Sequence, residues 1–220
     1  MNAPLVHSVA TIDTSAYPRP ARRRRALIIV LAGIDGAGKS TAGRLLARQL
    51  DAAGRPAIYT MNPCGRSRMI AWSDRLGLKV PSSLQDVAET TIRCVNVLVS
   101  QLRAAYFPGI VIMDRYLYCQ LALKRVKGLS PGQLLPWLLR LLPRPDVVFY
   151  FDVPAHLALT RIFKRATDTE DLETLEDFDK GYRELDDFPS FVRIDAGQSP
   201  EQIVEDLWRE LVATGRVPRS

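Results

Sequence analysis

The segment Gly33-Ile34-Asp35-Gly36-Ala37-Gly38-Lys39-Ser40-Thr41 fits the pattern G-x-x-x-x-G-K-[ST] of a loop that wraps the phosphates of a nucleoside triphosphate. The run before it, Ala26–Ala32, is short, apolar and rich in β-branched residues, which predicts a buried parallel strand. The run after it, Ser40–Leu50, carries leucines and arginines at helical spacing. Because the motif stands between a strand and a helix, we interpret it as a nucleotide-binding site rather than as a glycine turn that only joins two elements.

Each residue type in this loop has a physical role. Its glycines adopt backbone angles closed to other residues and let main-chain N–H groups approach anionic oxygens. Lys39 adds a mobile positive charge for the β- and γ-phosphates, and the Ser40 hydroxyl can ligate Mg²⁺. The residues that we expect to bind the triphosphate are Gly33, Ile34, Asp35, Gly36, Ala37, Gly38, Lys39, Ser40 and Thr41.

The length and composition of the chain limit its class. At 220 residues it is long enough for one sizeable core. No apolar run approaches the roughly 20 residues that a membrane-spanning helix needs, and Met1–Pro20 lack the apolar region of a secretory signal. We expect residues 1–25, which end in Arg22–Arg25, to be a flexible basic leader. Three widely spaced cysteines without a metal-binding pattern favour a reduced, cytoplasmic compartment.

The formal net charge of +6 is carried mostly by arginine. Such a charge is compatible with nucleic-acid binding, but no RNA- or DNA-binding signature accompanies it. Some arginines belong to the solvated leader, and others are candidates to face phosphates. We therefore expect small-molecule nucleotides as partners, and neither nucleic acid nor a membrane.

Strand and helix patterns alternate along the chain. Apolar runs predict strands at Ala26–Ala32, Ala57–Met61, Ile110–Met113, Val147–Phe151 and Phe191–Ile194. Helical patterns lie at Ser40–Ala53, Ser67–Leu76, Leu84–Tyr106, Tyr116–Lys127, Pro131–Leu142, Ala155–Ala166, Leu172–Leu185 and Pro200–Ala213. This order predicts an α/β fold with a parallel sheet covered on both faces. The charged stretch Thr167–Asp187 is interpreted as a mobile flap followed by a helix.

Asp35 places a carboxylate inside the phosphate loop, where it repels phosphate unless a cation offsets its charge. Three interpretations stay open. The carboxylate orients an arginine, contacts a sugar hydroxyl of an acceptor substrate, or caps N–H groups of the loop.

A second carboxylate, Asp114, ends an apolar run and is followed directly by Arg115. Ligands of open parallel sheets bind at the carboxyl ends of the strands. We expect Asp114 to act with Ser40 at Mg²⁺, and Arg115 to clamp a phosphate. Asp152 follows another strand with the same geometry and is a rival for the metal role, but no basic residue follows it.

Other arginines supply further candidates. Arg93 lies on a largely apolar helical segment, where a buried guanidinium needs an anionic partner. That partner is either a structural carboxylate or the phosphate or base of the acceptor. Arg161, Lys164 and Arg165 end a helical segment before an acidic stretch. They are either lid cations that stabilise a transferred phosphoryl group or a solvated helix end.

Taken together, these residues resemble the thymidylate kinase family of P-loop nucleoside monophosphate kinases, from about Ala26 to Val212. The resemblance is carried by the loop with its internal Asp35, by Val111-Ile-Met-Asp-Arg-Tyr116, and by Arg93 at the family's spacing before this segment. The segment Pro145-Asp-Val-Val-Phe-Tyr-Phe-Asp-Val-Pro154 is similar to a later strand of the family that leads toward the lid.

The resemblance implies a P-loop NTPase fold over residues 26–216, with a five-stranded parallel sheet flanked by helices on both faces and a lid at about residues 161–175. It implies an ATP- and Mg²⁺-dependent kinase that phosphorylates a nucleoside monophosphate, with dTMP as the first candidate, in what is often a homodimer. Catalytic roles fall by position on Lys39, Asp35, Arg115, Arg161 and Arg165. The implied acceptor-binding residues are Asp35, Pro63, Arg66, Arg93, Arg115 and Gln120.

The chain departs from the family pattern after its second predicted strand. Residues 60–65 read Thr-Met-Asn-Pro-Cys-Gly, where many relatives read Thr-Arg-Glu-Pro-Gly-Gly. An arginine and a glutamate are therefore missing. Arg66 and Arg68 are candidates to replace the arginine.

Further departures fall on the base-reading positions and on the lid. Glu89 stands where relatives commonly stack an aromatic ring on thymine, and Val95 replaces a polar residue. Glu170 or Asp171 takes the place of a second lid arginine. A replacement ring is available from Trp72, Tyr116 or Tyr118, each of which is also readily explained as core.

Two rivals to a dTMP kinase follow from these departures. One is a kinase on the same scaffold that acts on a modified nucleotide, a nucleoside or a small metabolite, as Glu89 and Val95 would favour. The other is a non-catalytic nucleotide-sensing module whose lid has lost its function. Product formation distinguishes the sensor from both kinases.

Overall fold

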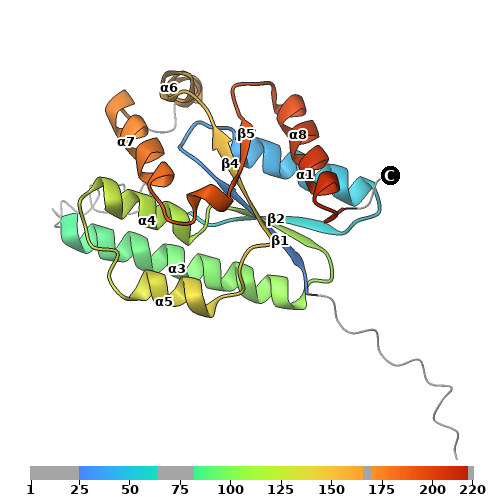
Figure 1. The fold of residues 1–220 in the computed structure, drawn as a ribbon, viewed down its shortest axis with the longest axis horizontal. Coiled ribbons are helices and arrows are strands. Elements are labelled where there is room, and N and C mark those ends of the chain that lie inside the picture. Colours follow the sequence, from blue (N-terminus) through green and yellow to red (C-terminus); the bar gives the residue numbers. More distant parts are fainter. Residues whose placement is uncertain (1–24, 64–81, 166–169, 218–220) are drawn as a thin grey trace, which may run out of the picture.

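The computed structural model describes residues 25–63, 82–165 and 170–217. Its centre is a parallel sheet in the order β2-β3-β1-β4-β5, which confirms the predicted α/β fold (Figure 1). The strands are β1 (Leu27–Ala32), β2 (Ala57–Met61), β3 (Ile110–Asp114), β4 (Val147–Asp152) and β5 (Val192–Asp195). Each lies within about one residue of its predicted bounds, because strands covered on both faces read as apolar runs.

Helices connect the strands on both sides of the sheet. They are α1 (Lys39–Ala52), α3 (Ser82–Tyr106), α4 (Leu117–Val126), α5 (Leu134–Leu141), α6 (Ala155–Arg165), α7 (Leu172–Arg183), the short 3₁₀ helix η2 (Phe188–Ser190) and α8 (Pro200–Ala213). The prediction that a helix begins at Pro131 was wrong. Gly132 adopts a positive φ of 65°, so α5 begins only at Leu134. The predicted helix Ser67–Leu76 lies outside the described residues.

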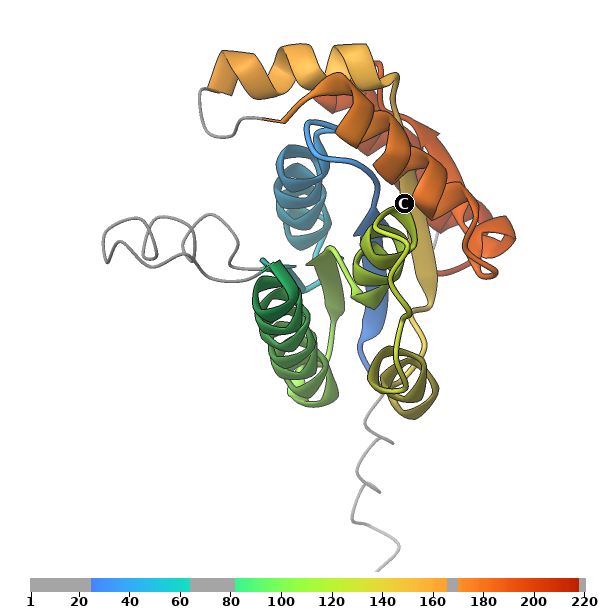
Figure 2. The same ribbon diagram turned by 90° about the vertical axis from the view of Figure 1, so that its left-hand side faces the viewer.

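Two apolar clusters cover the two faces of the sheet. On one face, alternate strand residues such as Ile29 and Phe149 pack against α1, α6 and α8. On the other face, their neighbours Ile28 and Val148 pack against α3, α4 and α5. Figure 2 shows helices on both sides of the strands. Because strand side chains alternate between faces, each of β1 to β4 contributes to both clusters.

The carboxyl ends of β1, β2 and β3 meet at one edge of the sheet. In the parallel ladders Leu31 pairs with Asp114, and Met61 also pairs with Asp114. The phosphate loop follows β1 at this edge, and α6 lies above it in Figure 1. The fold therefore brings together the segments in which the sequence analysis placed the triphosphate, metal and acceptor residues.

The terminal segments and the predicted lid are described only in part. Of the predicted leader, residues 1–24 lie outside the described residues, and Arg25 donates a 2.7 Å hydrogen bond to the carbonyl of Arg144. Within the lid at about 161–175, residues 161–165 end α6 and residues 172–175 begin α7. In the described ranges no helix is long and apolar enough to cross a membrane.

Close packing between α4 and α7 can be tested with Gly181→Ala. A β-carbon at Gly181 would lie 2.8 Å from the carbonyl oxygen of Ala122 and 2.8 Å from Cγ2 of Val126. Overpacking costs about 1–3 kcal/mol, whereas Gly to Ala within a helix gains at most roughly 1 kcal/mol. We expect a lower free energy of unfolding in urea denaturation. Lys180→Ala, at the exposed neighbouring position, is the control and should change it by less than about 0.5 kcal/mol. A more stable Gly181→Ala protein would contradict the packing.

Candidate active site

The phosphate loop has the backbone geometry that its sequence predicts. Gly33, Gly36 and Gly38 adopt φ values of 132°, 78° and 89°, which L-residues rarely adopt. A β-carbon at Gly36 would lie 2.3 Å from the carbonyl oxygen of Ala158, so α6 packs directly against the loop. The glycines therefore serve both the curvature of the loop and its contact with the neighbouring helix.

Lys39 is buried at the beginning of α1, with 5% of its surface exposed. Its ammonium donates hydrogen bonds to the carbonyls of Gly33 (2.9 Å) and Ile34 (2.5 Å). Burial lowers the pKa of Lys39, and the nearby carboxylate of Asp114 opposes this effect. A buried cation inside the loop is suited to stabilising phosphate oxygens, since its charge is little screened by water.

Ser40 and Asp114 meet across the sheet edge, as the metal hypothesis requires. The Ser40 hydroxyl donates to Oδ2 of Asp114, and the Tyr59 hydroxyl donates to the same oxygen over 2.5 Å. The other oxygen, Oδ1, is buried and has no hydrogen-bond partner among the described residues. Burial and the Asp114 carboxylate raise the pKa of Tyr59, so this phenol stays protonated as a donor. Sequence reasoning missed Tyr59, because in sequence it reads only as part of a strand.

The rival carboxylate Asp152 is engaged elsewhere. It forms ion pairs with Arg183, at 2.6 Å, and with Arg193. Burial acts to raise the pKa of Asp152, but the hydrogen bonds from the two arginines outweigh it and the pKa is lowered. These arginines occupy both oxygens, so the contacts favour Asp114 over Asp152 as partner of Ser40.

Asp35 and Arg115 form an ion pair that links the phosphate loop to the end of β3. Arg115 has a φ of 71° and is the one residue other than glycine with a positive φ in the described part of the chain. Its N–H donates to the carbonyl of Leu31 (3.0 Å), and its carbonyl accepts from Nδ2 of Asn62 (2.8 Å). Of the interpretations of Asp35, the contacts agree with the one in which the carboxylate orients an arginine.

Arg93 is buried on α3 and contacts the chain after β2. Its Nη1 donates to the carbonyl of Asn62 over 2.7 Å. In the next residue, Pro63, the carbonyl accepts from Nδ2 of Asn96 (2.8 Å). The structure thus places Arg93 and Pro63 at the same sheet edge as Arg115. Arg66, Arg68 and Trp72 lie outside the described residues.

Gln120 on α4 is 1% exposed and reaches α3. Its Nε2 donates to Oγ1 of Thr90 (2.9 Å), and the Thr90 hydroxyl donates to the carbonyl of Asp86 (2.7 Å). Oε1 of Gln120 is buried and lacks a hydrogen-bond partner among the described residues. A buried acceptor left unpaired in this way is a candidate ligand contact.

The two departures on α3 differ in position. Glu89 is buried, 2% exposed, and lies one helical turn before Arg93. Val95 is 51% exposed, because two residues along an α-helix rotate a side chain by about 200° away from Arg93. The structure therefore corrects the expectation that Val95 marks a base-reading position. Of the two departures, only Glu89 is buried and lies one turn from Arg93 on α3.

Tyr182 on α7 is a further residue that sequence reasoning missed. It is completely buried, and its hydroxyl has no hydrogen-bond partner among the described residues. Burial raises the pKa of Tyr182, while the charges of Arg115 and Arg93 oppose the rise, as expected for groups that share one region. The Tyr182 ring packs against Tyr150 and Phe178 in the core, and its unpaired hydroxyl is a candidate contact that sequence reasoning did not single out.

Two residues of the predicted lid, Arg161 and Asp171, have local partners. Arg161 donates to the carbonyls of Ala196 (2.7 Å), Gly197 (3.3 Å) and Gln198 (3.4 Å), which tie α6 to the segment after β5. Arg165 is exposed at the end of α6. The side chain of Asp171 caps α7 by accepting from the N–H of Thr174, a contact that lowers the pKa of Asp171.

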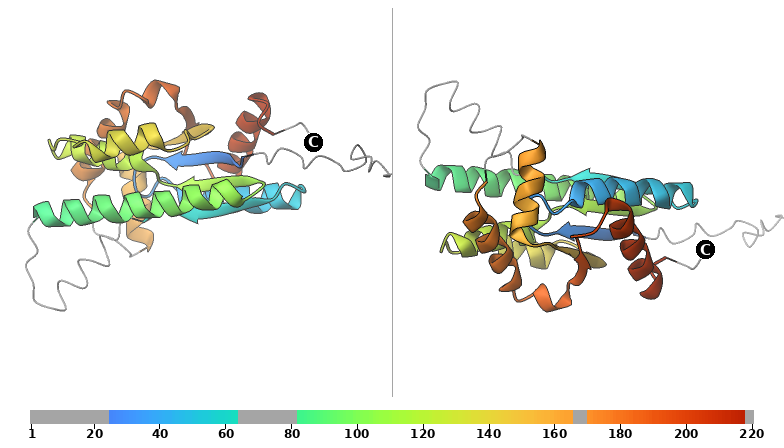
Figure 3. Two further views of the ribbon diagram at one scale, coloured as in Figure 1. Left: turned by 90° about the horizontal axis from the view of Figure 1, so that it is seen from below. Right: turned by 90° about the horizontal axis from the view of Figure 1, so that it is seen from above.

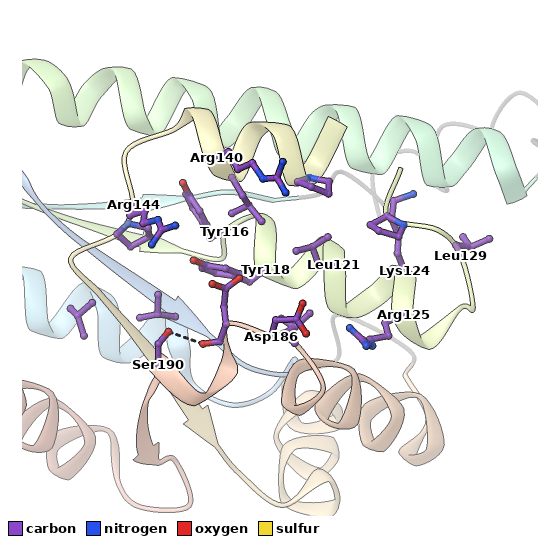
Figure 4. Close-up of a pocket in the computed structure, with 18 of the residues that line it drawn as sticks. Tyr116, Tyr118, Leu121, Lys124, Arg125, Leu129, Arg140, Arg144, Asp186 and Ser190 are labelled. Atoms are coloured by element: carbon purple, nitrogen blue, oxygen red, sulfur yellow. Dashed lines mark hydrogen bonds between the residues drawn. The ribbon is translucent and has the colours of Figure 1, made fainter. Parts of the chain in front are cut away.

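The tyrosines considered as stacking rings belong to the core. Tyr116 is 2% exposed, and its hydroxyl accepts from Nε2 of Gln101 (3.0 Å). Tyr118 packs edge-on against Phe191, with ring centroids 5.0 Å apart. Both rings line a cavity of about 830 Å³ between α4, α5 and the chain after α7 (Figure 4). Because this cavity borders the beginning of β4, it lies at the opposite edge of the sheet from the phosphate loop and is not assigned to the active site.

The parallel sheet and the glycine loop with its buried lysine define a P-loop nucleotide-binding protein. The family model described as thymidylate kinase matches residues 31–207. A probable thymidylate kinase of Thermococcus gammatolerans is 29% identical over 204 residues, covering 84% of this chain and 94% of the relative. A thymidylate kinase of Xanthomonas euvesicatoria pv. vesicatoria is 34% identical over 161 residues, covering 70% of this chain and 68% of the relative. A probable thymidylate kinase of Thermococcus onnurineus is 30% identical, covering 82% of this chain and 95% of the relative. The chain belongs to the thymidylate kinase family.

The role of the buried cation can be tested with Lys39→Met, which keeps the length of the side chain and removes its charge. We expect ATP turnover to fall by at least about a hundredfold, because a fixed charge at the phosphates is lost. The thermal unfolding midpoint and the circular dichroism spectrum should show a folded protein. Arg48→Met, an exposed cation on the same helix, is the control and should keep full turnover. Full activity of the Lys39 variant would overturn the assignment of the loop.

Proposed function

We propose that this protein transfers the γ-phosphoryl group of ATP to dTMP and so forms dTDP. Its membership of the thymidylate kinase family supports this proposal, as does a phosphate loop that lies next to a second cationic centre. In this arrangement Lys39 neutralises charge on the triphosphate, and Arg115 and Arg93 hold the phosphate of the acceptor. Positioning and electrostatic stabilisation would supply most of the rate enhancement, since phosphoryl transfer needs little covalent chemistry from the protein.

The observation that carries the choice of acceptor is the orientation of the Gln120 amide. The Thr90 hydroxyl gives its proton to the Asp86 carbonyl, so its oxygen can only accept from Gln120. The amide therefore turns its N–H groups to Thr90 and presents Oε1 as the available acceptor. Thymine carries an N–H donor at N3, whereas cytosine carries an acceptor there. The fixed amide thus favours a base of the thymine type.

The oxygen atoms near the loop suit Mg²⁺, which commonly binds through one or two protein oxygens together with substrate phosphates. The hydroxyl of Ser40 and the buried, unpartnered Oδ1 of Asp114 would hold the ion. Mg²⁺ would supply charge neutralisation and orientation of the triphosphate. No group of three or more metal-ligating side chains occurs in the described ranges, which agrees with an ion held mainly by its substrate.

Asp35 and the end of α6 complete the proposed site. Asp35 holds Arg115 beside the loop, so that the arginine reaches the acceptor phosphate in one defined orientation. Arg161 and Arg165 lie on the helix that packs against Gly36, and we assign them to the lid that covers the transferred group. Arg161 would have to exchange its carbonyl contacts after β5 for phosphate oxygens when the lid closes.

One observation favours a different acceptor on the same scaffold. Glu89 places a buried carboxyl group one turn from Arg93, where relatives commonly stack a ring on thymine. A carboxylate accepts hydrogen bonds, so it would suit a base or a metabolite that offers additional N–H or O–H donors. A nucleotide sensor without activity is the remaining rival and would form no product.

A panel of acceptors decides between these functions. With ATP and Mg²⁺, we expect kcat/KM for dTMP to exceed that for dCMP, AMP, GMP and the nucleosides by at least about a hundredfold, as for a site that pairs a buried polar group. Gln120→Met should lower kcat/KM for dTMP by about tenfold or more, because the acceptor for N3–H is lost. Leu121→Met on the same helix is the control. Preference for another acceptor would replace dTMP, and ATP binding without any product would favour the sensor.

We further propose that two copies of the chain associate through α3. This helix, which lies along the outside of the molecule (Figure 3), carries an exposed apolar stripe with spacings of three and four residues, interrupted between Val87 and Val95 by the exposed Thr91. Its members are Leu84, Val87, Val95, Leu98, Val99, Leu102 and Tyr106. They are uncharged and 41–70% exposed, so the stripe is complementary to a second copy of itself across a two-fold axis.

Leu102→Glu tests this association. The side chain is 60% exposed, so a charge there should leave the monomer folded but should place two like charges in a two-fold interface. We expect light scattering after size-exclusion chromatography to give a dimer mass for the unmodified protein and a monomer mass for the variant. Phe163→Glu, at an exposed apolar residue on α6, should remain dimeric. A monomer mass for the unmodified protein would refute the interface.

A further inference from the structure

Asn62 follows β2 at the active-site edge and is completely buried, with 0% of its surface exposed. Its N–H donates to the carbonyl of Asp114 (3.1 Å), and its side-chain Nδ2 donates to the carbonyl of Arg115 (2.8 Å). Its own carbonyl accepts from Nη1 of Arg93 (2.7 Å), and its side-chain Oδ1 accepts from the hydroxyl of Ser100 (2.8 Å). Each polar atom of Asn62 therefore contacts a residue of the proposed metal or acceptor site, or the helix that carries Arg93.

The contact with Arg115 acts on a backbone conformation that needs support. A φ of 71° is unfavourable for a residue with a β-carbon and persists only where the surrounding structure holds it. Leu31 holds the N–H of Arg115, and Asn62 holds its carbonyl. With both backbone groups tied, the guanidinium is directed toward Asp35 in the phosphate loop.

The network requires an amide at this position. Asn62 donates at one side-chain atom and accepts at the other, and both partners are defined. An aspartate of the same size would present a second acceptor to the Arg115 carbonyl. Many relatives carry a glutamate at this position. Its ionised carboxylate can only accept hydrogen bonds, so it cannot donate to the Arg115 carbonyl. The support of Arg115 by a side-chain amide is thus a property of this chain and not of the family motif.

We propose that Asn62 is a positioning residue that sets the placement of Arg115 and Arg93 for the phosphate of the acceptor. It acts through these two arginines and does not touch the triphosphate. The inference rests on the proposed function in taking a nucleoside monophosphate as the acceptor. It predicts that loss of the amide changes acceptor binding much more than ATP binding.

The test is Asn62→Asp, assayed with dTMP and ATP at pH 8. We expect the KM for dTMP to rise by about tenfold, because an ionised carboxylate cannot donate to the Arg115 carbonyl, and the KM for ATP to change by less than about twofold. Equal changes in both KM values, or no change, would overturn the proposal.

Gln101→Glu is the matched control. Gln101 is 6% exposed on α3 and donates to the Tyr116 hydroxyl (3.0 Å) and the Pro143 carbonyl (3.1 Å), away from the arginines. Gln101→Glu removes a buried amide donor, as Asn62→Asp does. We therefore expect the two variants to destabilise the fold to a similar degree, but the control should change the KM for dTMP by less than about twofold. The same selective rise in the control would show general loosening and overturn the proposal.

A second variant and a structure keep the inference testable if Asn62→Asp fails to fold or if dTMP is not the acceptor. Ser100→Ala removes the donor to Oδ1 and should raise the KM for dTMP selectively by about threefold. A crystal structure of Asn62→Asp or, if that variant does not fold, of Ser100→Ala needs no substrate. It should show Arg115 relaxed from its positive φ and separated from Asp35. An unchanged Arg115 would overturn the positioning role, whereas failure of the unmodified protein to phosphorylate dTMP would refute only the proposed function.

Discussion

The parallel pairing of β1 with β3 is the constraint on which the site depends. Leu31 lies opposite Asp114, and the N–H of Arg115 continues the ladder by donating to Leu31 over 3.0 Å. This register places the beginning of the phosphate loop beside the end of β3, so that Ser40 reaches Asp114. A slip of one residue would turn Asp114 to the other face of the sheet and separate the two. The β2–β3 register then adds Asn62 at the same edge.

The convergence of strand ends concentrates buried polar groups, which are costly unless they find partners. The structure supplies these partners locally: loop carbonyls for Lys39, the Asn62 carbonyl for Arg93, and hydroxyl groups for Asp114. What remains unpaired in the described part is informative. Buried side-chain atoms without a partner among the described residues include Oδ1 of Asp114, Oε1 of Gln120, the Tyr182 hydroxyl and Oε1 of Gln101. Those that lie at the carboxyl edge of the sheet, as Asp114 does, are candidate contacts for a ligand.

Local sequence signals predicted the elements well where one physical cause dominates. Buried strands read as apolar runs, and α8 spans Pro200–Ala213 as predicted, because Pro200 and the capping box at Ser199 define its beginning. The start of α5 was wrong, since a glycine with positive φ interrupts an otherwise helical pattern. The interpretation of Val95 as a base-reading position was also wrong. Alignment to a motif gives spacing, whereas the helical rotation decides which side of α3 a residue occupies.

The sequence by itself determined that the chain has a phosphate-binding loop, an alternating α/β fold and the marks of the thymidylate kinase family, because these depend on residues close together in the chain. It also named Asp35, Arg93, Asp114, Arg115 and Gln120 as candidates. Only the tertiary structure decided that Ser40 meets Asp114 rather than Asp152, that Asp35 holds Arg115, and which way the Gln120 amide points. It alone brought Asn62 and Tyr59 to the site. Each of these contacts joins residues far apart in sequence, and their meeting is set by strand register and helix packing rather than by any local pattern.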